Sequence, residues 1–136
     1  MSAVTFDERG LVPVVVQDYT TGEVLMLAYA NEEALRLTQE SGELYLFSRS
    51  RKRLWHKGET SGNVMKVRRL TLDCDGDAVL ALVCPQGPAC HTGHRSCFFE
   101  DIMKGPDGDA TFPGKLWQYL LKRKGADPKE SYTAKL

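Results

Sequence analysis

Metal-ligating side chains are concentrated between positions 73 and 97 of this 136-residue chain, in the sequence DCDGDAVLALVCPQGPACHTGHRSC. This segment contains all four cysteines, two of the three histidines and three aspartates at alternate positions. Thiolate and imidazole are donors that zinc prefers, whereas carboxylate oxygens suit a hard cation such as magnesium. The segment therefore predicts metal chemistry.

The cysteines of this segment are widely spaced, at Cys74, Cys84, Cys90 and Cys97. No C-x-x-C pair, which is typical of closed structural zinc sites, is present. We therefore expect an open zinc site, with three protein donors from separate elements or separate chains and one position left for water. A disulfide framework is the alternative, but the sequence shows no secretory signal segment and is long enough to build a core without cross-links.

The aspartates stand at every second position: Asp73, Asp75 and Asp77. In an extended backbone their carboxylates would project to one face and gather oxygen ligands for magnesium, while Cys74 would point to the other face. Either Gly76 bends the chain or a second subunit completes the site. An EF-hand calcium loop is excluded, because Ala78 and Cys84 occupy the positions of its turn glycine and bidentate glutamate. A solvent-facing acidic turn is the other alternative.

A polar loop, RSRKRLWHKGETSGN, occupies positions 49 to 63. Its five basic side chains and its glycine and hydroxyl residues can bind phosphate, and its tryptophan can stack on a planar base. The residues that we assign to such a nucleotide pocket are Arg49, Arg51, Trp55, Lys57, Gly58, Thr60, Ser61 and Gly62. A solvated basic face that contacts RNA explains the loop equally well. His56 is expected to make an ordinary hydrogen bond.

The elements that must position these groups are mainly strands. Residue patterns predict strands at 12–19, 23–30, 43–50, 64–72, 78–84 and 96–102, the first two joined as a hairpin by a Thr-Thr-Gly turn. A helix is expected between a cap at Asn31 and an end at Gly42. We therefore predict an α+β fold, mainly antiparallel, in which a curled sheet packs against one helix. The formal net charge is zero, and no apolar run approaches the roughly 20 residues needed to cross a membrane.

Three motifs resemble the phosphoribosyl-AMP cyclohydrolases of histidine biosynthesis: SRSRKRLWHKGETSGN at 48–63, DCDGDA at 73–78 and GPACHTGHRSCFF at 87–99. The resemblance covers about residues 10–103 and implies a cytoplasmic homodimer with a pseudobarrel fold. It implies that zinc is held by Cys74 of one subunit with Cys90 and Cys97 of the other. It also implies that magnesium is held by Asp73, Asp75 and Asp77.

The resemblance further implies the reaction, which is hydrolytic opening of the N1–C6 bond of the adenine ring in phosphoribosyl-AMP. The partner is then a small-molecule substrate, with no nucleic acid and no membrane. Zinc lowers the pKa of a bound water, but three thiolates make that water less acidic, so a nearby base is expected. His91, adjacent to Cys90, is our candidate, and His94 is the alternative.

Two other functions compete with this interpretation. A zinc deaminase would also deliver hydroxide to C6 of adenine, but its H-x-E and P-C-x-x-C signatures are absent. A zinc-stabilised RNA-binding module would account for the basic loop and Trp55. Its RNA affinity would fall steeply with salt.

The C-terminal part is expected to be separate from a cyclohydrolase domain at 1–103. We predict a linker at 104–112, a helix at 113–124 that ends at Gly125, and an irregular tail. The sequence LWQYLLKRKGADPKESYTAKL at 116–136 resembles the opening of the phosphoribosyl-ATP pyrophosphohydrolase domain, which is fused behind the cyclohydrolase in some organisms. The acidic metal-binding residues of that domain have no counterpart here, so we do not expect pyrophosphohydrolase activity. The segment 113–136 is then either a remnant of that domain or the start of one that has been truncated.

Overall fold

The computed structural model describes residues 4–106 of the chain. The chain divides into two compact units, Met1–Glu100 and Asp101–Leu136, and all helices and strands reported below belong to the first. The predicted C-terminal helix and tail, together with most of the predicted linker, lie outside the described residues.

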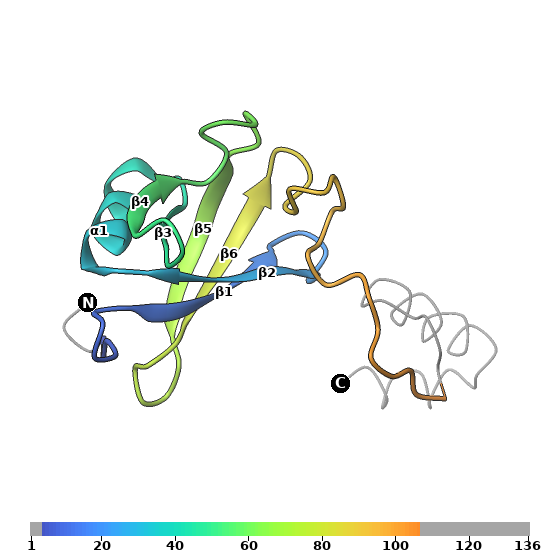
Figure 1. The fold of residues 1–136 in the computed structure, drawn as a ribbon, viewed down its shortest axis with the longest axis horizontal. Coiled ribbons are helices and arrows are strands. Elements are labelled where there is room, and N and C mark those ends of the chain that lie inside the picture. The colour runs from blue at the N-terminus through green and yellow to red at the C-terminus, as the bar shows by residue number, and fades with distance from the viewer. Residues whose placement is uncertain (1–3, 107–136) are drawn as a thin grey trace, which may run out of the picture. The chain divides into compact units, whose positions relative to one another are not determined.

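The described residues form one helix and six strands (Figure 1). In chain order the elements are β1 (Val12–Asp18), β2 (Val24–Ala30), α1 (Glu32–Ser41), β3 (Tyr45–Ser48), β4 (Arg53–His56), β5 (Met65–Leu72) and β6 (Val79–Pro85). A four-stranded sheet has the order β2-β1-β6-β5, and β3 and β4 pair with each other as a second sheet. All pairings are antiparallel except that of β1 with β6. The predicted α+β, mainly antiparallel class is confirmed, but the strands divide between two sheets.

The β1–β2 hairpin forms where the sequence predicts it. The two strands pair from Val12 opposite Ala30 to Gln17 opposite Val24, with a register shift between Val16 and Gln17. The turn is closed by Asp18, whose Oδ1 accepts hydrogen bonds from the backbone N–H groups of the next two threonines at 2.7 and 3.3 Å. A carboxylate that bonds the backbone two residues ahead is a common turn-forming device.

Helix α1 begins and ends at the predicted residues. The Asn31 side chain accepts a hydrogen bond from the backbone N–H of Ala34 at 2.8 Å, and Gly42 adopts the left-handed conformation with φ of 78°. On the inner face of the helix, the buried Thr38 hydroxyl donates to the Ala34 carbonyl and accepts from the backbone N–H of Tyr45 at 2.9 Å. This hydroxyl ties the helix to the start of β3.

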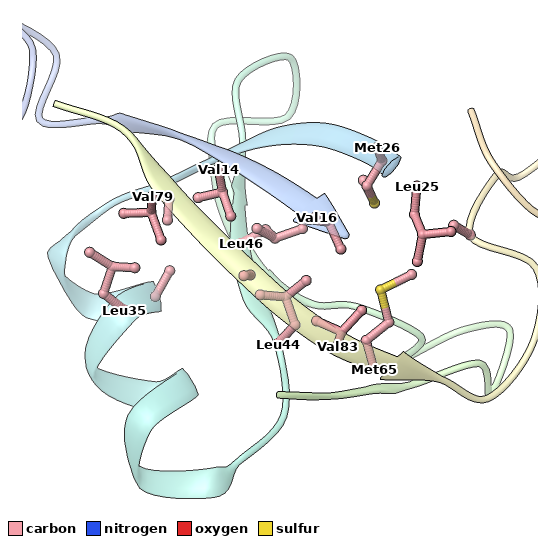
Figure 2. Packing of buried hydrophobic residues seen from close by; sticks show 14 of the residues in the cluster. Val14, Val16, Leu25, Met26, Leu35, Leu44, Leu46, Met65, Val79 and Val83 are labelled. Atoms are coloured by element: carbon pink, nitrogen blue, oxygen red, sulfur yellow. The ribbon is translucent and has the colours of Figure 1, made fainter. Parts of the chain in front are cut away.

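The core lies between the four-stranded sheet on one side and α1 with the β3–β4 hairpin on the other (Figure 2). Strands β1 and β6 bury every second side chain, as expected for strands with one face on a core. The buried residues include Val12, Val14, Val16, Leu25, Leu35, Leu44, Leu46, Met65, Val79, Ala81 and Val83. The helix and hairpin thus leave the outer face of the sheet uncovered by described elements.

Two sequence predictions about strands are wrong. The segment 49–63 is not one loop, because a turn at Lys52, with φ of 54°, folds Arg53–His56 back onto β3 as strand β4. The predicted strand at 96–102 is absent. There the Ser96 hydroxyl donates to the carbonyl of Val24 at 2.8 Å and accepts from the backbone N–H of Phe98 at 3.0 Å. A side-chain hydroxyl, and not a neighbouring strand, therefore provides the hydrogen bonds of these backbone groups.

No helix within residues 4–106 combines the length and the apolar character needed to cross a membrane.

Candidate active site and metal centre

A cavity of about 930 Å³ opens between the β3–β4 hairpin, strand β2 and the segment that follows β6. Of the eight residues assigned to a nucleotide pocket, seven line it, and Gly62 does not. Cys90 and His91 line it as well, so the structure brings the basic segment and part of the cysteine segment to one cavity.

The wall formed by β2 and the β3–β4 hairpin combines aromatic rings with cations. The Arg49 guanidinium carbon lies 4.0 Å from the ring centroid of Tyr29, and the Lys57 ammonium lies 5.5 Å from that of Trp55. Both are cation–π distances. Positive charge and flat apolar surface therefore occur side by side, as recognition of an anionic molecule with a planar ring requires.

The segments 57–63 and 87–97 touch each other at two points. The Lys57 ammonium donates a hydrogen bond to the Ala89 carbonyl at 2.8 Å. Gly87 has no space for a side chain, since a Cβ there would lie 2.3 Å from the Asn63 side-chain oxygen. Burial lowers the pKa of Lys57, and the charges of Cys97 and Cys90 oppose this effect. A lysine is thus fixed beside two thiols.

The thiols of Cys90 and Cys97 lie in one irregular loop and interact with each other. A hydrogen bond with the Thr92 hydroxyl at 3.0 Å lowers the pKa of Cys90. Desolvation of its sulfur, followed by the charge of Cys90, raises the pKa of Cys97. Both thiols are free, so neither belongs to the disulfide framework considered above. Two adjacent sulfur donors, one with thiolate character, suit a soft divalent cation such as zinc.

Cys74 lies far from this pair within one chain. It belongs to the β5–β6 loop, whereas Cys90 and Cys97 follow the other end of β6, and the two loops lie at opposite ends of that strand (Figure 1). Strand β6 has seven residues, which at about 3.3 Å per residue spans roughly 20 Å. Among the described residues, no metal-ligand cluster includes a cysteine. A single copy therefore presents an incomplete set of sulfur donors.

Three carboxylates meet in the β5–β6 loop: Asp73, Asp75 and Asp77 offer oxygen atoms within 4.8 Å of one another. They are not gathered by an extended backbone, and that part of the prediction is wrong. Gly76, with φ of 75°, bends the chain, and one Asp73 oxygen accepts from the backbone N–H groups of Asp77 and Ala78 at 3.0 and 3.2 Å. The turn places the side chains together, and this bend at Gly76 is the first of the two alternatives in the sequence analysis.

The three carboxylates of this cluster change one another's pKa values. Hydrogen bonds with Asp75 and then Asp73 raise the pKa of Asp77 to about 6. Desolvation acts to raise the pKa of Asp73, but hydrogen bonds from Asp77 and the backbone outweigh it and lower that pKa. Asp77 therefore binds a proton more tightly than an isolated aspartate does, at a place where a hard cation with oxygen ligands would fit.

The two histidines of the cysteine loop differ in their surroundings. His91 is exposed and lines the cavity. His94 stacks on the Phe99 ring at 3.8 Å between centroids, and its Nδ1 lies 2.9 Å from the Thr92 hydroxyl. His56, as expected, makes an ordinary hydrogen bond, from Nε2 to Glu43 at 2.7 Å. The geometry favours His91 over His94 as the histidine that meets a bound molecule.

Comparison with known proteins gives the family. The sequence model described as phosphoribosyl-AMP cyclohydrolase matches residues 26–99, which include the basic segment, the acidic turn and the cysteine loop. The phosphoribosyl-AMP cyclohydrolase of Archaeoglobus fulgidus is 62% identical over 97 residues, covering 71% of this chain and 90% of that protein. The chain belongs to the phosphoribosyl-AMP cyclohydrolase family.

Longer proteins are similar to this chain over more of its length. The histidine biosynthesis bifunctional protein HisIE of Thermus thermophilus is 52% identical over 136 residues, covering 100% of this chain and 64% of that protein. The bifunctional protein HisIE of Caldanaerobacter subterraneus is also 52% identical, over 128 residues, covering 94% of this chain and 62% of that protein. The chain thus spans less than two thirds of the length of these bifunctional relatives.

The sequence analysis missed some of the residues that join the segments of this site. Tyr29 on β2 and Asn63 line the cavity, but neither belongs to a pattern of charged or sulfur donors. Lys57 was assigned to phosphate, whereas its ammonium lies against the Ala89 carbonyl beside the thiols. Lys57 and Asn63 lie within the polar segment 49–63, whereas Tyr29 lies in an apolar strand and has no such signal in the sequence.

Proposed function

We propose that this chain catalyses the hydrolytic opening of the N1–C6 bond in the adenine ring of phosphoribosyl-AMP, a reaction of histidine biosynthesis. The observation that carries the proposal is that one cavity combines a basic and aromatic wall with Cys90, His91 and the nearby Lys57. Family membership over residues 26–99 supports it independently. Together these findings favour a small-molecule enzyme over an RNA-binding surface, since the basic residues face a cavity.

The proposal assigns zinc to Cys90 and Cys97 of one subunit and Cys74 of a second copy. Three thiolates with an open position match the donor chemistry of a catalytic zinc site. When bound there, zinc supplies a hydroxide nucleophile near neutral pH. The length of β6 supports a shared site, because zinc–sulfur bonds of about 2.3 Å require the sulfurs to lie within about 4.6 Å of one another.

An exposed apolar surface beside the cysteine loop supports the proposed homodimer. Val24, Leu27, Phe98 and Phe99 have exposed fractions of 40 to 63%, which is high for such side chains. They adjoin the thiol pair, since the backbone N–H of Cys97 donates to the carbonyl of Leu25 at 2.7 Å. A second copy placed there would cover apolar side chains and bring its own acidic turn to the thiols. The pseudobarrel belongs to the same proposal, with β2 contacting β3 without pairing.

The remaining assigned residues bind and orient the substrate in this proposal. Trp55 stacks on the purine, while Arg49 and Arg51 neutralise phosphate together with the amides of Gly58 to Gly62. His91 accepts the proton of the attacking water, because it faces the cavity next to Cys90. The carboxylates of Asp73, Asp75 and Asp77 hold magnesium, which typically shares its oxygen ligands with substrate phosphates.

The proposal places the enzyme in the cytoplasm, where cysteine thiols remain reduced and available to a metal. It includes a cyclohydrolase domain at 1–103 followed by a linker and a C-terminal segment. No nucleic acid or membrane partner is part of it.

A spectroscopic turnover assay with phosphoribosyl-AMP tests the proposal. We expect turnover by the protein as purified, loss of turnover after chelation, and recovery on addition of zinc with magnesium. Release of ammonia instead of ring opening would identify a deaminase. Salt-sensitive RNA binding without turnover of phosphoribosyl-AMP would favour the RNA-binding module and reject the cyclohydrolase.

A further inference from the structure

The loop that carries Cys90 and Cys97 has no helix or strand of its own, yet it is held at both ends. Inside the loop, the Arg95 carbonyl accepts a hydrogen bond from the backbone N–H of Ala89 at 3.0 Å, and the His94 carbonyl accepts one from that of Cys90 at 3.1 Å. These two bonds connect residues 89 and 90, at the first thiol, to residues 94 and 95, which precede the second thiol on Cys97. The separation of the two sulfurs therefore depends on where residues 94 and 95 are held.

Arg95 is attached to a distant part of the chain, the turn between β1 and β2. Its guanidinium donates to the second carboxylate oxygen of Asp18, to Glu23 with an Nε to Oε1 distance of 2.5 Å, and to the Thr21 hydroxyl at 3.3 Å. The next two residues reach the same hairpin, through Ser96 to the Val24 carbonyl and through the Cys97 amide. One side chain thus makes three of the contacts that join the loop to the hairpin.

Asp18 is suited to be the fixed end of this attachment. Its side chain is 5% exposed, whereas that of Arg95 is 49% exposed. Burial alone would raise the pKa of Asp18, but hydrogen bonds from the backbone of Thr20 and Thr21 and from Arg95 outweigh it and lower that pKa. The carboxylate uses one oxygen to close the β-turn and the other to bind the guanidinium. A buried carboxylate that loses its cation is strongly destabilised, so the pair is a rigid connection.

We propose that Asp18 and Arg95 are positioning residues for the metal ligands of this enzyme: their ion pair sets the separation of the Cys90 and Cys97 thiols. The inference rests on the proposed function, because it takes the two thiols to bind a soft divalent cation. Neither residue touches the cavity or supplies a donor. Partners that orient metal ligands typically change metal affinity by about 10- to 100-fold when they are removed.

The experiment compares zinc affinity in wild type, Arg95→Ala, Arg95→Lys and Asp18→Asn, measured by competition with a chromophoric chelator. We expect Arg95→Ala and Asp18→Asn to bind zinc about 10- to 100-fold more weakly. Arg95→Lys should recover only part of this loss, because an ammonium cannot reproduce the forked contacts to three acceptors. The matched control is Arg36→Ala, which breaks exposed ion pairs with Glu33 and Glu40 on α1 and should bind zinc as wild type does.

Two further measurements separate positioning from general stability. The visible spectrum of the cobalt-substituted protein should change in the variants, since it reports the arrangement of the ligands. In metal-free protein, the Cys97 amide should exchange its hydrogen faster in Arg95→Ala, while core amides in β1 and β6 should keep wild-type protection. If Arg95→Ala does not fold, Arg95→Lys decides between the same outcomes.

The outcomes of this experiment are distinct. Wild-type zinc affinity and an unchanged cobalt spectrum in Arg95→Ala and Asp18→Asn would overturn the inference and leave the proposed function intact. Failure of the wild type to bind zinc or cobalt would overturn the proposed metal site and the inference with it. Weaker binding that is matched by equal loss of protection throughout the core would also reject a positioning role.

Discussion

A shared metal site makes a quantitative prediction about mixtures of inactive variants. In the proposed site, Cys74→Ser removes the donor that one subunit gives to its neighbour, and Cys97→Ser removes a donor from the other half of the site. In a mixed dimer one site receives both defects and the other receives none. If the chains pair at random, about half of the dimers are mixed and each has one intact site, so about 25% of wild-type activity should return.

The magnitude follows from the strand geometry. Strand β6 separates the two half-sites by roughly 20 Å, far more than one zinc ion can bridge, so no rearrangement within a single chain restores the site. The assay is turnover of phosphoribosyl-AMP after the two purified variants are unfolded together, refolded with zinc and compared with each variant alone. The control is a mixture of Cys90→Ser with Cys97→Ser, in which both defects fall in the same half-site and no activity should return. Recovery in the control, or none in the test mixture, would refute the shared site.

Three further predictions concern the acidic turn and the basic segment. Hydrogen bonds with Asp75 and Asp73 raise the pKa of Asp77 to about 6, so magnesium affinity should weaken as the pH falls through about 6. Calorimetry in buffers of different ionisation enthalpy should detect proton release on binding, and equal affinity at about pH 5 and pH 8 would contradict this. Because this pKa is raised in the folded state, metal-free protein should also lose stability as the pH rises from about 4 to 6. Gly58→Ala should lower the free energy of unfolding by at least about 2 kcal/mol, since φ is 92° and a Cβ would lie 2.5 Å from the backbone of Asn63. Gly62→Ala, with φ of 80° and open space, should cost only about 1 to 2 kcal/mol in denaturant unfolding, and equal losses would exclude the close contact as the cause.

The local elements were predictable because their signals are local. Asn31 and Gly42 mark the ends of α1 by capping chemistry, and the alternation along β1 and β6 reflects one buried face. The β4 strand was missed because it has only four residues and lies within a polar segment, and its pairing depends on a turn at Lys52. The parallel pairing of β1 with β6 has no local signal at all, since it joins segments far apart in the chain.

The candidate site shows the same division between local and distant information. Candidate metal donors in the segment 73–97 could be proposed from residue type and spacing, and the structure gathers the carboxylates by a turn at Gly76. The attachment of Arg95 to Asp18 could not be predicted, because the two residues are 77 positions apart and neither is unusual in its local sequence. Pairwise contacts of this kind follow from the tertiary fold, which brings the β1–β2 turn beneath the cysteine loop.

The parallel pairing of β1 with β6 also has a consequence for biosynthesis of the protein. Val14 pairs with Val79, so the central strands of the sheet cannot join until more than half of the chain has left the ribosome. Pairings with such long sequence separation are slow, because the intervening chain must lose its freedom before the contact stabilises it. Until then the β1–β2 hairpin exposes its apolar face, and chaperones would bind the chain during this interval.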